Sequence, residues 1–257
     1  MAQCEKLGVS FHFNSWAEAD RIEAENPDAV ILATGGLAHT EVLSEGNDLV
    51  VSSWDIISGD VKPGTDVLIF DDAGDHAGLQ AAEVLASAGA AVEIMTPDHA
   101  FAPEVMPMNL VPYMRSLQKL DVTFTVTYRL GSVRRSGNKL VAVIGSDYGG
   151  LRKERIVDQT VVNHGTIPLD DLYFDLKPRS KNQGEISYDQ LIDGQPQSAV
   201  RNADGSYQLF RIGDAVAARN THAAVYDALR LAKDIRARRH VCQPCFGSAF
   251  SARSRGR

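Results

Sequence analysis

Cysteine is scarce in this sequence, and long apolar runs are missing from it. The 257 residues include three cysteines, Cys4, Cys242 and Cys245, which are too few for a framework of disulfides. No run approaches the roughly 20 apolar residues that a helix needs to cross a bilayer, and the opening MAQCEKLGVS holds no apolar signal-peptide core. We therefore expect a soluble, cytoplasmic protein with no membrane partner.

Positive charge is limited except at the C-terminus. The formal net charge is −7, which gives no indication of a nucleic-acid-binding surface. Residues 236–257 carry six arginines among serine and glycine, a composition that predicts a disordered basic tail. Cys242 and Cys245 lie in that tail at C-x-x-C spacing, but no second pair completes a metal site, so we expect no metal there.

Two short segments far apart in the chain share one pattern, an apolar run that ends in glycine. Ala29 to Ala33 is typical of a strand buried on both faces of a parallel sheet, and Thr34-Gly35-Gly36 follows it. Tyr207 to Ile212 predicts a short strand that ends in Gly213-Asp214, and Thr221 to Lys233 predicts a helix. Glycines at a strand end let a ligand approach the backbone, and a helix N-terminus favours a phosphate. Together the segments predict two halves of one nucleotide site, although each alone is also typical of an ordinary turn.

The chain between these halves predicts a second, complete βαβ unit. Asp66 to Phe70 (DVLIF) predicts a buried strand, Leu79 to Ala88 a helix that ends at Gly89, and Val92 to Thr96 the next strand. The intervening turn, DDAGDHAG, lacks the three glycines that present backbone N–H groups to phosphates.

This turn contains three carboxylates, those of Asp71, Asp72 and Asp75. Their negative charges would repel a pyrophosphate, so we expect weak binding of NAD(P)H or none. A divalent cation is an alternative ligand for them together with His76, but their spacing matches no recognised site. A solvated acidic turn with an aspartate capping the following helix is the favoured interpretation. His164, at the end of a later strand, is a candidate proton donor or ligand, although no acidic partner is evident and a structural role is favoured.

The remaining patterns predict shorter elements. Gly8 to Asn14 alternates like a strand, and Trp16 to Asn26 predicts a helix capped by Ser15. Arg155 to Asn163 predicts another buried strand, which closes the inserted unit, and Thr221 is the expected N-cap of the last helix. A β meander is predicted over Thr123–Tyr128, Ser132–Arg135 and Lys139–Ile144, with its hairpin turn at Ser136-Gly137-Asn138.

The sequence resembles the C-terminal half of the trimethylamine dehydrogenase and 2,4-dienoyl-CoA reductase group of flavoproteins. The resemblance rests on the order of four features along the chain: ATGG, the inserted βαβ unit, VVNHGTIP and RIGDA. Leu172 to Leu191 more narrowly resembles bacterial N-methylproline and dimethylglycine demethylases of that group. The resemblance implies an α/β fold class: a FAD/NAD(P)-binding, three-layer Rossmann-like domain that lacks its first βαβ unit, with a second NAD-like domain inserted. It implies a first FAD-like part at 1–60, the inserted domain at 61–156, and a second FAD-like part at 157–235.

Site residues and cofactors follow from the same resemblance. It implies that Thr34, Gly35, Gly36, Gly213 and Asp214 line a FAD or ADP site, with Gly165, Thr221 and His222 as further cofactor-binding residues. FMN and a 4Fe–4S cluster are expected only on an N-terminal barrel that this sequence lacks. We therefore expect no catalytic residue and no metal ligand here.

Three functions are compatible with these patterns. The first is the FAD- or ADP-binding portion of a flavin-dependent oxidoreductase that demethylates small N-methylated amines or amino acids. Its partners are then the amine substrate and an electron acceptor of the full-length enzyme, with a homo-oligomer as a further expectation. The alternatives are a stand-alone NAD(P)H–flavin reductase and a non-catalytic ADP-binding scaffold.

Overall fold

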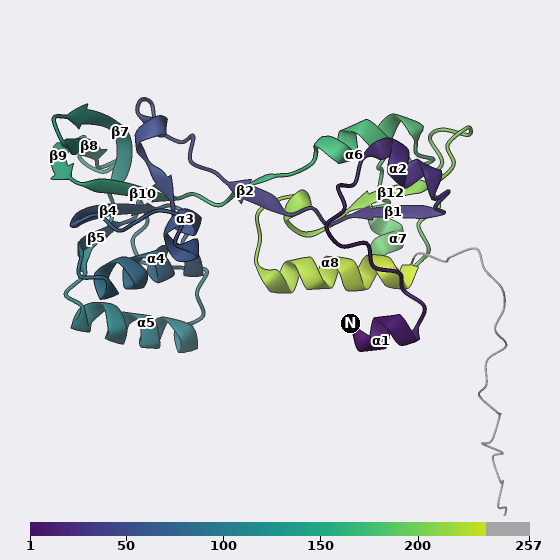
Figure 1. Cartoon of the computed structure of the whole chain (residues 1–257), viewed down its shortest axis with the longest axis horizontal. Helices are drawn as coiled ribbons and strands as arrows, with labels where there is room; N and C mark the ends of the chain where they lie inside the picture. The colour runs from purple at the N-terminus through teal and green to yellow at the C-terminus, as the bar shows by residue number, and fades with distance from the viewer. Residues whose placement is uncertain (235–257) are drawn as a thin grey trace, which may run out of the picture. The chain divides into compact units, whose positions relative to one another are not determined.

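The computed structural model describes residues 1–234 and divides the chain into two compact units (Figure 1). Unit 1 combines Met1–Leu32, Leu172–Phe210 and the residues from Tyr226, and unit 2 combines Ala33–Asp171 and Arg211–Val225. The predicted basic tail at 236–257, with Cys242 and Cys245, lies outside the described residues. The boundaries expected for the inserted domain stay a prediction.

Unit 2 is built on a five-stranded parallel sheet with the strand order β3-β10-β4-β5-β6. The order reverses at β4, because β5 and β6 follow it on one side and β10 lies on the other. The buried strand predicted at Asp66 to Phe70 is confirmed as β4. The strand bounds are β3 Val51–Ser52, β4 Asp66–Asp71, β5 Ala91–Met95, β6 Thr123–Thr125 and β10 Gln159–Asn163.

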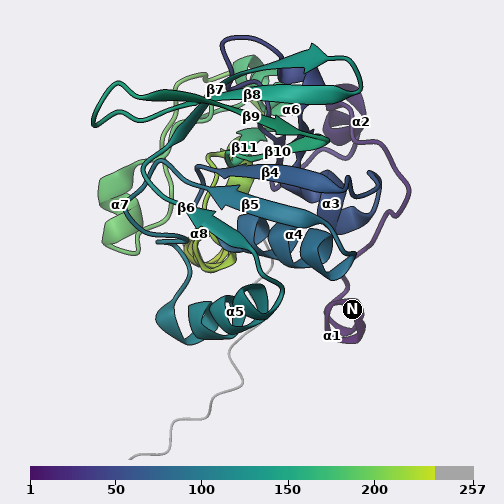
Figure 2. The same cartoon turned by 90° about the vertical axis from the view of Figure 1, so that its left-hand side faces the viewer.

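Both faces of this sheet are covered, which is why β4 is apolar at four consecutive positions. Val67 and Ile69 pack in the cluster that includes residues of α3 (Ser53–Ser58), α4 (His76–Ser87) and α5 (Pro107–Lys119). Leu68 and Phe70 pack against a second, three-stranded sheet on the opposite face (Figure 2). Successive side chains of a strand point to opposite faces, so a strand buried on both sides needs an unbroken apolar run.

The three-stranded sheet is antiparallel and contains β7 (Arg129–Ser136), β8 (Lys139–Gly145) and β9 (Arg152–Val157). Its predicted hairpin turn is confirmed by the pairing of Ser136 with Lys139, with φ of +58° at Gly137. Two predictions were wrong here. Thr123–Thr125 joins the parallel sheet beside β5, and the stretch from Arg155 to Asn163 breaks at Asp158 into β9 and β10. At the break, Asp158 N–H donates to the Asp66 carbonyl at 2.8 Å, and the chain passes from the antiparallel sheet to the parallel one.

Unit 1 packs around a two-stranded sheet of β1 (Ala29–Leu32) and β12 (Gln208–Arg211). Val30, Leu32 and Leu209 are buried in its core with residues of α6 (Asp171–Leu176). The other elements are α1 Ala2–Lys6, α2 Ala19–Ala24, a 3₁₀ turn at Lys177–Arg179 and α7 Tyr188–Ile192. The last predicted helix is confirmed as α8 (Thr221–Asp234), whose residues up to Val225 belong to unit 2 and from Tyr226 to unit 1.

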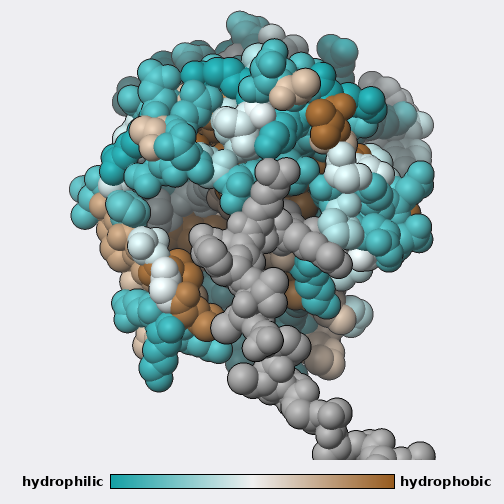
Figure 3. Space-filling view, turned by 90° about the vertical axis from the view of Figure 1, so that its right-hand side faces the viewer, coloured by the Kyte–Doolittle hydropathy of each residue, from teal (hydrophilic) through white to brown (hydrophobic). Residues whose placement is uncertain are grey.

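The N-terminal predictions for unit 1 were wrong in detail. Gly8 to Asn14 is not a strand, and Phe11 and Phe13 stack on each other with ring centroids 5.7 Å apart. The helix predicted from Trp16 begins at Ala19, with Glu18 and not Ser15 at its N-cap. Alternation alone does not make a strand, because a strand also needs a hydrogen-bonding neighbour. Several apolar side chains of this region remain exposed. On the face of the molecule drawn in Figure 3, scattered apolar residues, in brown, lie on a mostly hydrophilic surface.

Short elements complete unit 2. β2 (Gly36–Ala38) pairs antiparallel with β11 (Thr166–Pro168), and 3₁₀ turns occupy Asn47–Leu49 and Gly213–Ala215. Within residues 1–234, the helices are all too short or too polar to cross a bilayer.

Candidate functional site

The turn from β4 to α4 is held by a buried carboxylate. Asp71, the last residue of β4, is fully buried, and its Oδ1 accepts hydrogen bonds from Gly74 N–H at 3.1 Å and Asn163 Nδ2 at 2.8 Å. Its Oδ2 has no hydrogen-bond partner among residues 1–234. Burial away from water raises the pKa of this carboxyl to about 6, and the charge of Asp75 adds to the rise. The prediction of a solvated acidic turn was therefore wrong for Asp71.

Asp75 caps α4, as the sequence predicts for an aspartate of this turn. Its Oδ1 accepts the N–H of Ala77 at 2.9 Å, and its backbone is extended, as an N-cap requires. The same oxygen accepts a second hydrogen bond, from Asn163 Nδ2 at 3.0 Å. A negative side chain at the start of a helix also interacts favourably with the helix dipole.

Asn163 connects these carboxylates to the neighbouring strand. It ends β10, where the parallel register places it opposite Asp71, and it is buried. Its Oδ1 accepts the hydroxyl of Ser53 at 2.9 Å, and its carbonyl accepts the N–H groups of Asp72 at 2.9 Å and Ala73 at 3.1 Å. One asparagine therefore joins the first residue of α3, the end of β4 and the N-cap of α4.

The third carboxylate of the turn contacts a histidine. Asp72 Oδ2 lies 2.7 Å from His164 Nδ1 and 3.5 Å from an Arg129 nitrogen. His39 packs edge-on against the His164 ring, with centroids 5.1 Å apart. The expectation that His164 lacks an acidic partner was wrong, because the partner is 92 positions away in sequence. Among residues 1–234, no group of three or more His, Cys, Asp or Glu side chains is arranged to hold a metal ion.

A cleft of about 740 Å³ opens beside this network, and all of its lining residues belong to unit 2. One wall comes from the start of α4 and from Trp54 of α3, a second from the end of β10, and a third from the turn before α8. The principal polar lining residues are Asp75, His76, Gln80, Glu104, Asn163, His164, Thr166, Asp214, Arg219, Asn220 and Thr221.

Three of the expected cofactor-binding residues line this cleft: Gly165, Asp214 and Thr221. Gly165 has φ of +84°, a conformation that favours glycine, and Asp214 Oδ1 accepts Arg219 N–H at 3.3 Å. The predicted capping role of Thr221 was wrong, because Asn220 Oδ1 accepts the Ala223 N–H at 2.9 Å and Asn220 is thus the N-cap of α8. The Thr221 side chain is exposed.

The other expected residues lie outside the cleft lining. Thr34 donates its hydroxyl to the Leu169 carbonyl at 2.5 Å, and Gly35, with φ of +76°, accepts Leu169 N–H at 3.0 Å. Gly36 pairs with Pro168, and a Cβ on it would come within 2.7 Å of the Ile167 carbonyl oxygen. The ATGG segment therefore packs against its own β11 backbone. Gly213 and His222 adjoin lining residues in sequence but do not contribute to the lining.

The sequence patterns missed Asn163, Trp54 and Gln80 as residues of the site. A polar residue that directly follows the buried run of β10 is the signal that points to Asn163. Trp54 and Gln80 carry no comparable signal, since each occupies an ordinary helical position.

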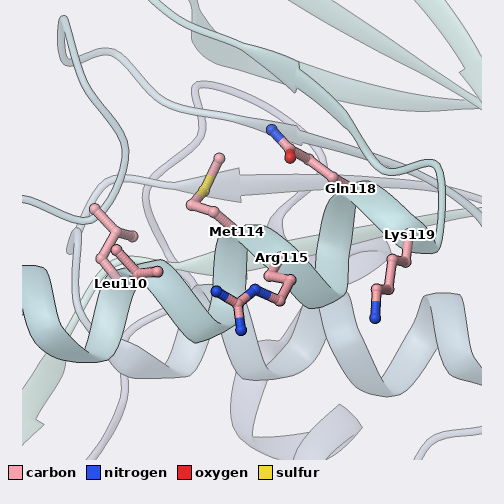
Figure 4. A pocket seen from close by; sticks show the side chains of 6 residues that line it. Leu110, Met114, Arg115, Gln118 and Lys119 are labelled. Atoms are coloured by element: carbon pink, nitrogen blue, oxygen red, sulfur yellow. The ribbon is translucent and has the colours of Figure 1, made fainter.

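A second hollow, of about 540 Å³, lies on the surface of α5 (Figure 4). It is a weaker candidate for a ligand site than the unit 2 cleft. It is lined by Leu110, Val111, Met114, Arg115, Gln118 and Lys119, all from one helix. Figure 4 shows Met114 and Gln118 projecting from one side of the helix and Arg115 and Lys119 from another. These side chains do not converge on a common point, so the unit 2 cleft is the candidate site.

Comparison with known proteins gives relatives over nearly the whole chain. No family model matches the sequence. The chain is 78% identical over 235 residues to a probable N-methylproline demethylase of Rhizobium meliloti, covering 91% of this chain and 35% of that protein. It is 43% identical over 240 residues to an N,N-dimethylglycine/sarcosine dehydrogenase of Chromohalobacter salexigens, covering 89% of this chain and 35% of that protein. The chain thus spans about a third of the length of the curated relatives it matches.

Solved structures agree with the fold. A 2-naphthoyl-CoA reductase is 26% identical with a TM-score of 0.69, over 92% of this chain and 31% of that one. Thioredoxin reductase of T. acidophilum is 18% identical with a TM-score of 0.52, over 79% of this chain and 63% of that one. The fold class is therefore confirmed as the mixed α/β, parallel-sheet fold of FAD/NAD(P)-binding reductases.

Proposed function

Because the chain belongs with the N-methylproline and dimethylglycine demethylase group of flavoprotein oxidoreductases, we propose that it is the portion of such an enzyme that holds FAD or ADP. The full-length enzyme oxidatively demethylates small N-methylated amines or amino acids. FMN, a 4Fe–4S cluster and the reacting substrate are held by a separate barrel, and electrons pass on to an acceptor. No residue of this chain is catalytic in this scheme.

The observation that carries the proposal is the convergence of Gly165, Asp214 and Thr221 on one cleft at the start of α8. The N-terminus of a helix of 14 residues offers N–H groups and a positive dipole end to a phosphate. The Asp214 carboxylate and the Thr221 hydroxyl suit the hydroxyl groups of a sugar or ribityl chain. The residues therefore fit one end of an adenine nucleotide or a flavin nucleotide. When bound, FAD supplies an electron-carrying ring, and the chain supplies position and hydrogen bonds.

Ligand-dependent melting tests the proposal. ADP and FAD, each added at about 1 mM, should raise the Tm of the purified chain, because a ligand that binds only the folded state stabilises it. Asp214→Asn should weaken binding by about tenfold, since it removes a charged acceptor for hydroxyl donors. Asp204→Asn, at an exposed carboxylate of unit 1, is the control and should leave binding unchanged.

The outcomes separate the candidate functions. A yellow protein with bound FAD supports the flavoprotein portion, whereas a colourless protein that binds ADP alone supports the scaffold alternative. If neither nucleotide shifts Tm, the proposed nucleotide site is wrong.

A further inference from the structure

The β4–α4 turn occupies the place where a dinucleotide-binding sheet takes its phosphates. The strand order reverses between β4 and β10, and open α/β sheets bind ligands in the crevice beyond the strand ends at such a reversal. Gly74 and Ala77 stand at the second and third positions of the G-x-G-x-x-G/A spacing, and Asp72 stands at the first. Gly74 retains a φ of +63°, and a Cβ on it would come within 2.5 Å of Pro103. The turn therefore keeps, at the second position of the spacing, a backbone conformation that favours glycine.

The N–H groups of this turn are already used within the chain. Those of Asp72 and Ala73 donate to the Asn163 carbonyl, at 2.9 and 3.1 Å. Those of Gly74 and Ala77 donate to the carboxylates of Asp71 and Asp75, at 3.1 and 2.9 Å. A phosphate at this turn binds through such N–H groups, so four of its donors are taken by the protein itself.

Carboxylates also surround the place where a pyrophosphate would bind. The Asp71 carboxylate lies against Gly78 of α4, where an added Cβ would come within 2.6 Å of its Cγ and Oδ2. Asn163 lines the cleft from the β10 side and donates hydrogen bonds to both Asp71 and Asp75. Glu104 adds a further carboxylate to the α4 wall of the cleft, and its N–H donates to the Gly74 carbonyl at 3.0 Å.

We propose that the β4–α4 turn is a dinucleotide-phosphate site occupied by the chain's own carboxylates, with Asp75 standing in for a phosphate, so that this unit does not bind NAD(P)H. The α4 wall of the cleft then accepts a neutral or cationic group. This inference does not depend on the proposed FAD or ADP site, because that site uses the N-terminus of α8.

The test compares the chain with a variant in which the turn is opened. Asp72→Gly/Asp75→Gly places glycine at the first position of the spacing and releases the Ala77 N–H, while glycine at an N-cap costs only about a few tenths of a kcal/mol. Asp121→Gly/Asp204→Gly removes the same charge at two exposed positions outside the cleft and is the matched control. Inorganic pyrophosphate and NADH are the probes, followed by calorimetric titration, with circular dichroism to verify folding.

With excess ADP present to occupy the α8 site, we expect neither probe to bind the unaltered chain or the control at about 1 mM, and the opened variant to bind pyrophosphate at least about tenfold more tightly than the control. NADH binding by the unaltered chain in excess ADP would overturn the proposal. So would a folded, opened variant whose affinity for pyrophosphate equals that of the control. ADP or FAD binding at the α8 site is measured separately and bears only on the proposed function.

Discussion

The side-chain amide of Asn163 donates to Asp71 at 2.8 Å, and this hydrogen bond joins the ends of the neighbouring strands β10 and β4 of unit 2. The same amide nitrogen reaches Asp75 at 3.0 Å, so a single neutral donor lies between two carboxylates. Buried polar groups are costly when they lose a partner, so this network should contribute to the stability of the turn.

Asn163→Asp should destabilise unit 2 more than Asn163→Ala does. The alanine variant leaves buried acceptors without their donor, at a cost of about 2–4 kcal/mol, whereas the aspartate adds a third negative charge to a buried cluster. Urea unfolding followed by the fluorescence of Trp54, in a Trp16→Phe background, measures both variants. Asn109→Ala, at an exposed position of α5, is the control and should change the free energy of unfolding by less than about 0.5 kcal/mol. Equal stability of the aspartate variant and the parent would contradict this description.

Asp71 should make unit 2 less stable as the pH rises from about 4 to about 6. Its pKa is about 6 in the folded protein against an ordinary value of 3.8, so folding favours the protonated carboxyl. The contribution of the protonated Asp71 carboxyl to the free energy of unfolding is fully present below the ordinary pKa. It is lost as the pH rises through the pKa of the folded protein, and the loss amounts to about 3 kcal/mol.

Asp71→Asn should remove this contribution. The amide keeps an oxygen for Gly74 and Asn163 but carries no charge. The difference in free energy of unfolding between Asp71→Asn and the parent should therefore shift in favour of the variant between pH 4 and pH 7, measured by urea unfolding at each pH. A difference that stays constant over this range would show that Asp71 titrates normally.

Gly78→Ala should destabilise unit 2 by several kcal/mol. The added Cβ would approach the Asp71 carboxylate to within 2.6 Å, and neither α4 nor the hydrogen-bonded carboxylate can move without breaking other contacts. Gly149→Ala is the matched control, because its Cβ meets only Leu151 at 3.8 Å. Thermal unfolding of the two variants should show a large fall in Tm for the first and little change for the second. Similar Tm values would mean that the α4–β4 contact is looser than described.

Asn182→Ala should open the edge of β12 in unit 1. Asn182 is buried, its Oδ1 accepts Leu209 N–H at 2.8 Å and its Nδ2 donates to the Leu209 carbonyl at 2.8 Å, as a neighbouring strand would. The variant leaves both groups without these partners, which costs about 2–4 kcal/mol. Exchange of the Leu209 amide hydrogen, measured by NMR, should become at least about tenfold faster. Gln195→Ala, at an exposed position of unit 1, should leave the exchange rate unchanged.

Several predictions that depend on neighbours in sequence were accurate, although the helix caps expected at Ser15 and Thr221 were wrong. The β4 strand, the helix that follows it, its aspartate cap and the Ser136–Lys139 hairpin are all confirmed. Each rests on interactions between residues a few positions apart, which the sequence displays directly. The strand expected at Gly8 to Asn14 was wrong because a strand needs a partner, and a pattern of side chains does not supply one.

The assignment of Thr34, Gly35, Gly36, Gly165, Gly213, Asp214, Thr221 and His222 to a cofactor stays a proposal. Their geometry divides them, because the ATGG segment packs on β11 while Gly165, Asp214 and Thr221 line the cleft. Motif spacing places a glycine at a strand end, but it does not reveal which side of the backbone a ligand or another strand covers.

The sequence by itself determined the class of fold, the acidic character of the β4–α4 turn and its poor match to a dinucleotide phosphate. Only the tertiary structure decided what those carboxylates do. Asp71 is buried, Asp72 meets His164 and Asp75 caps α4 while accepting from Asn163. The physical reason is strand order and register, which bring Asn163 opposite Asp71 across 92 positions of sequence. Hydrogen bonds between strand ends arise from that packing, and no local pattern of residues encodes them.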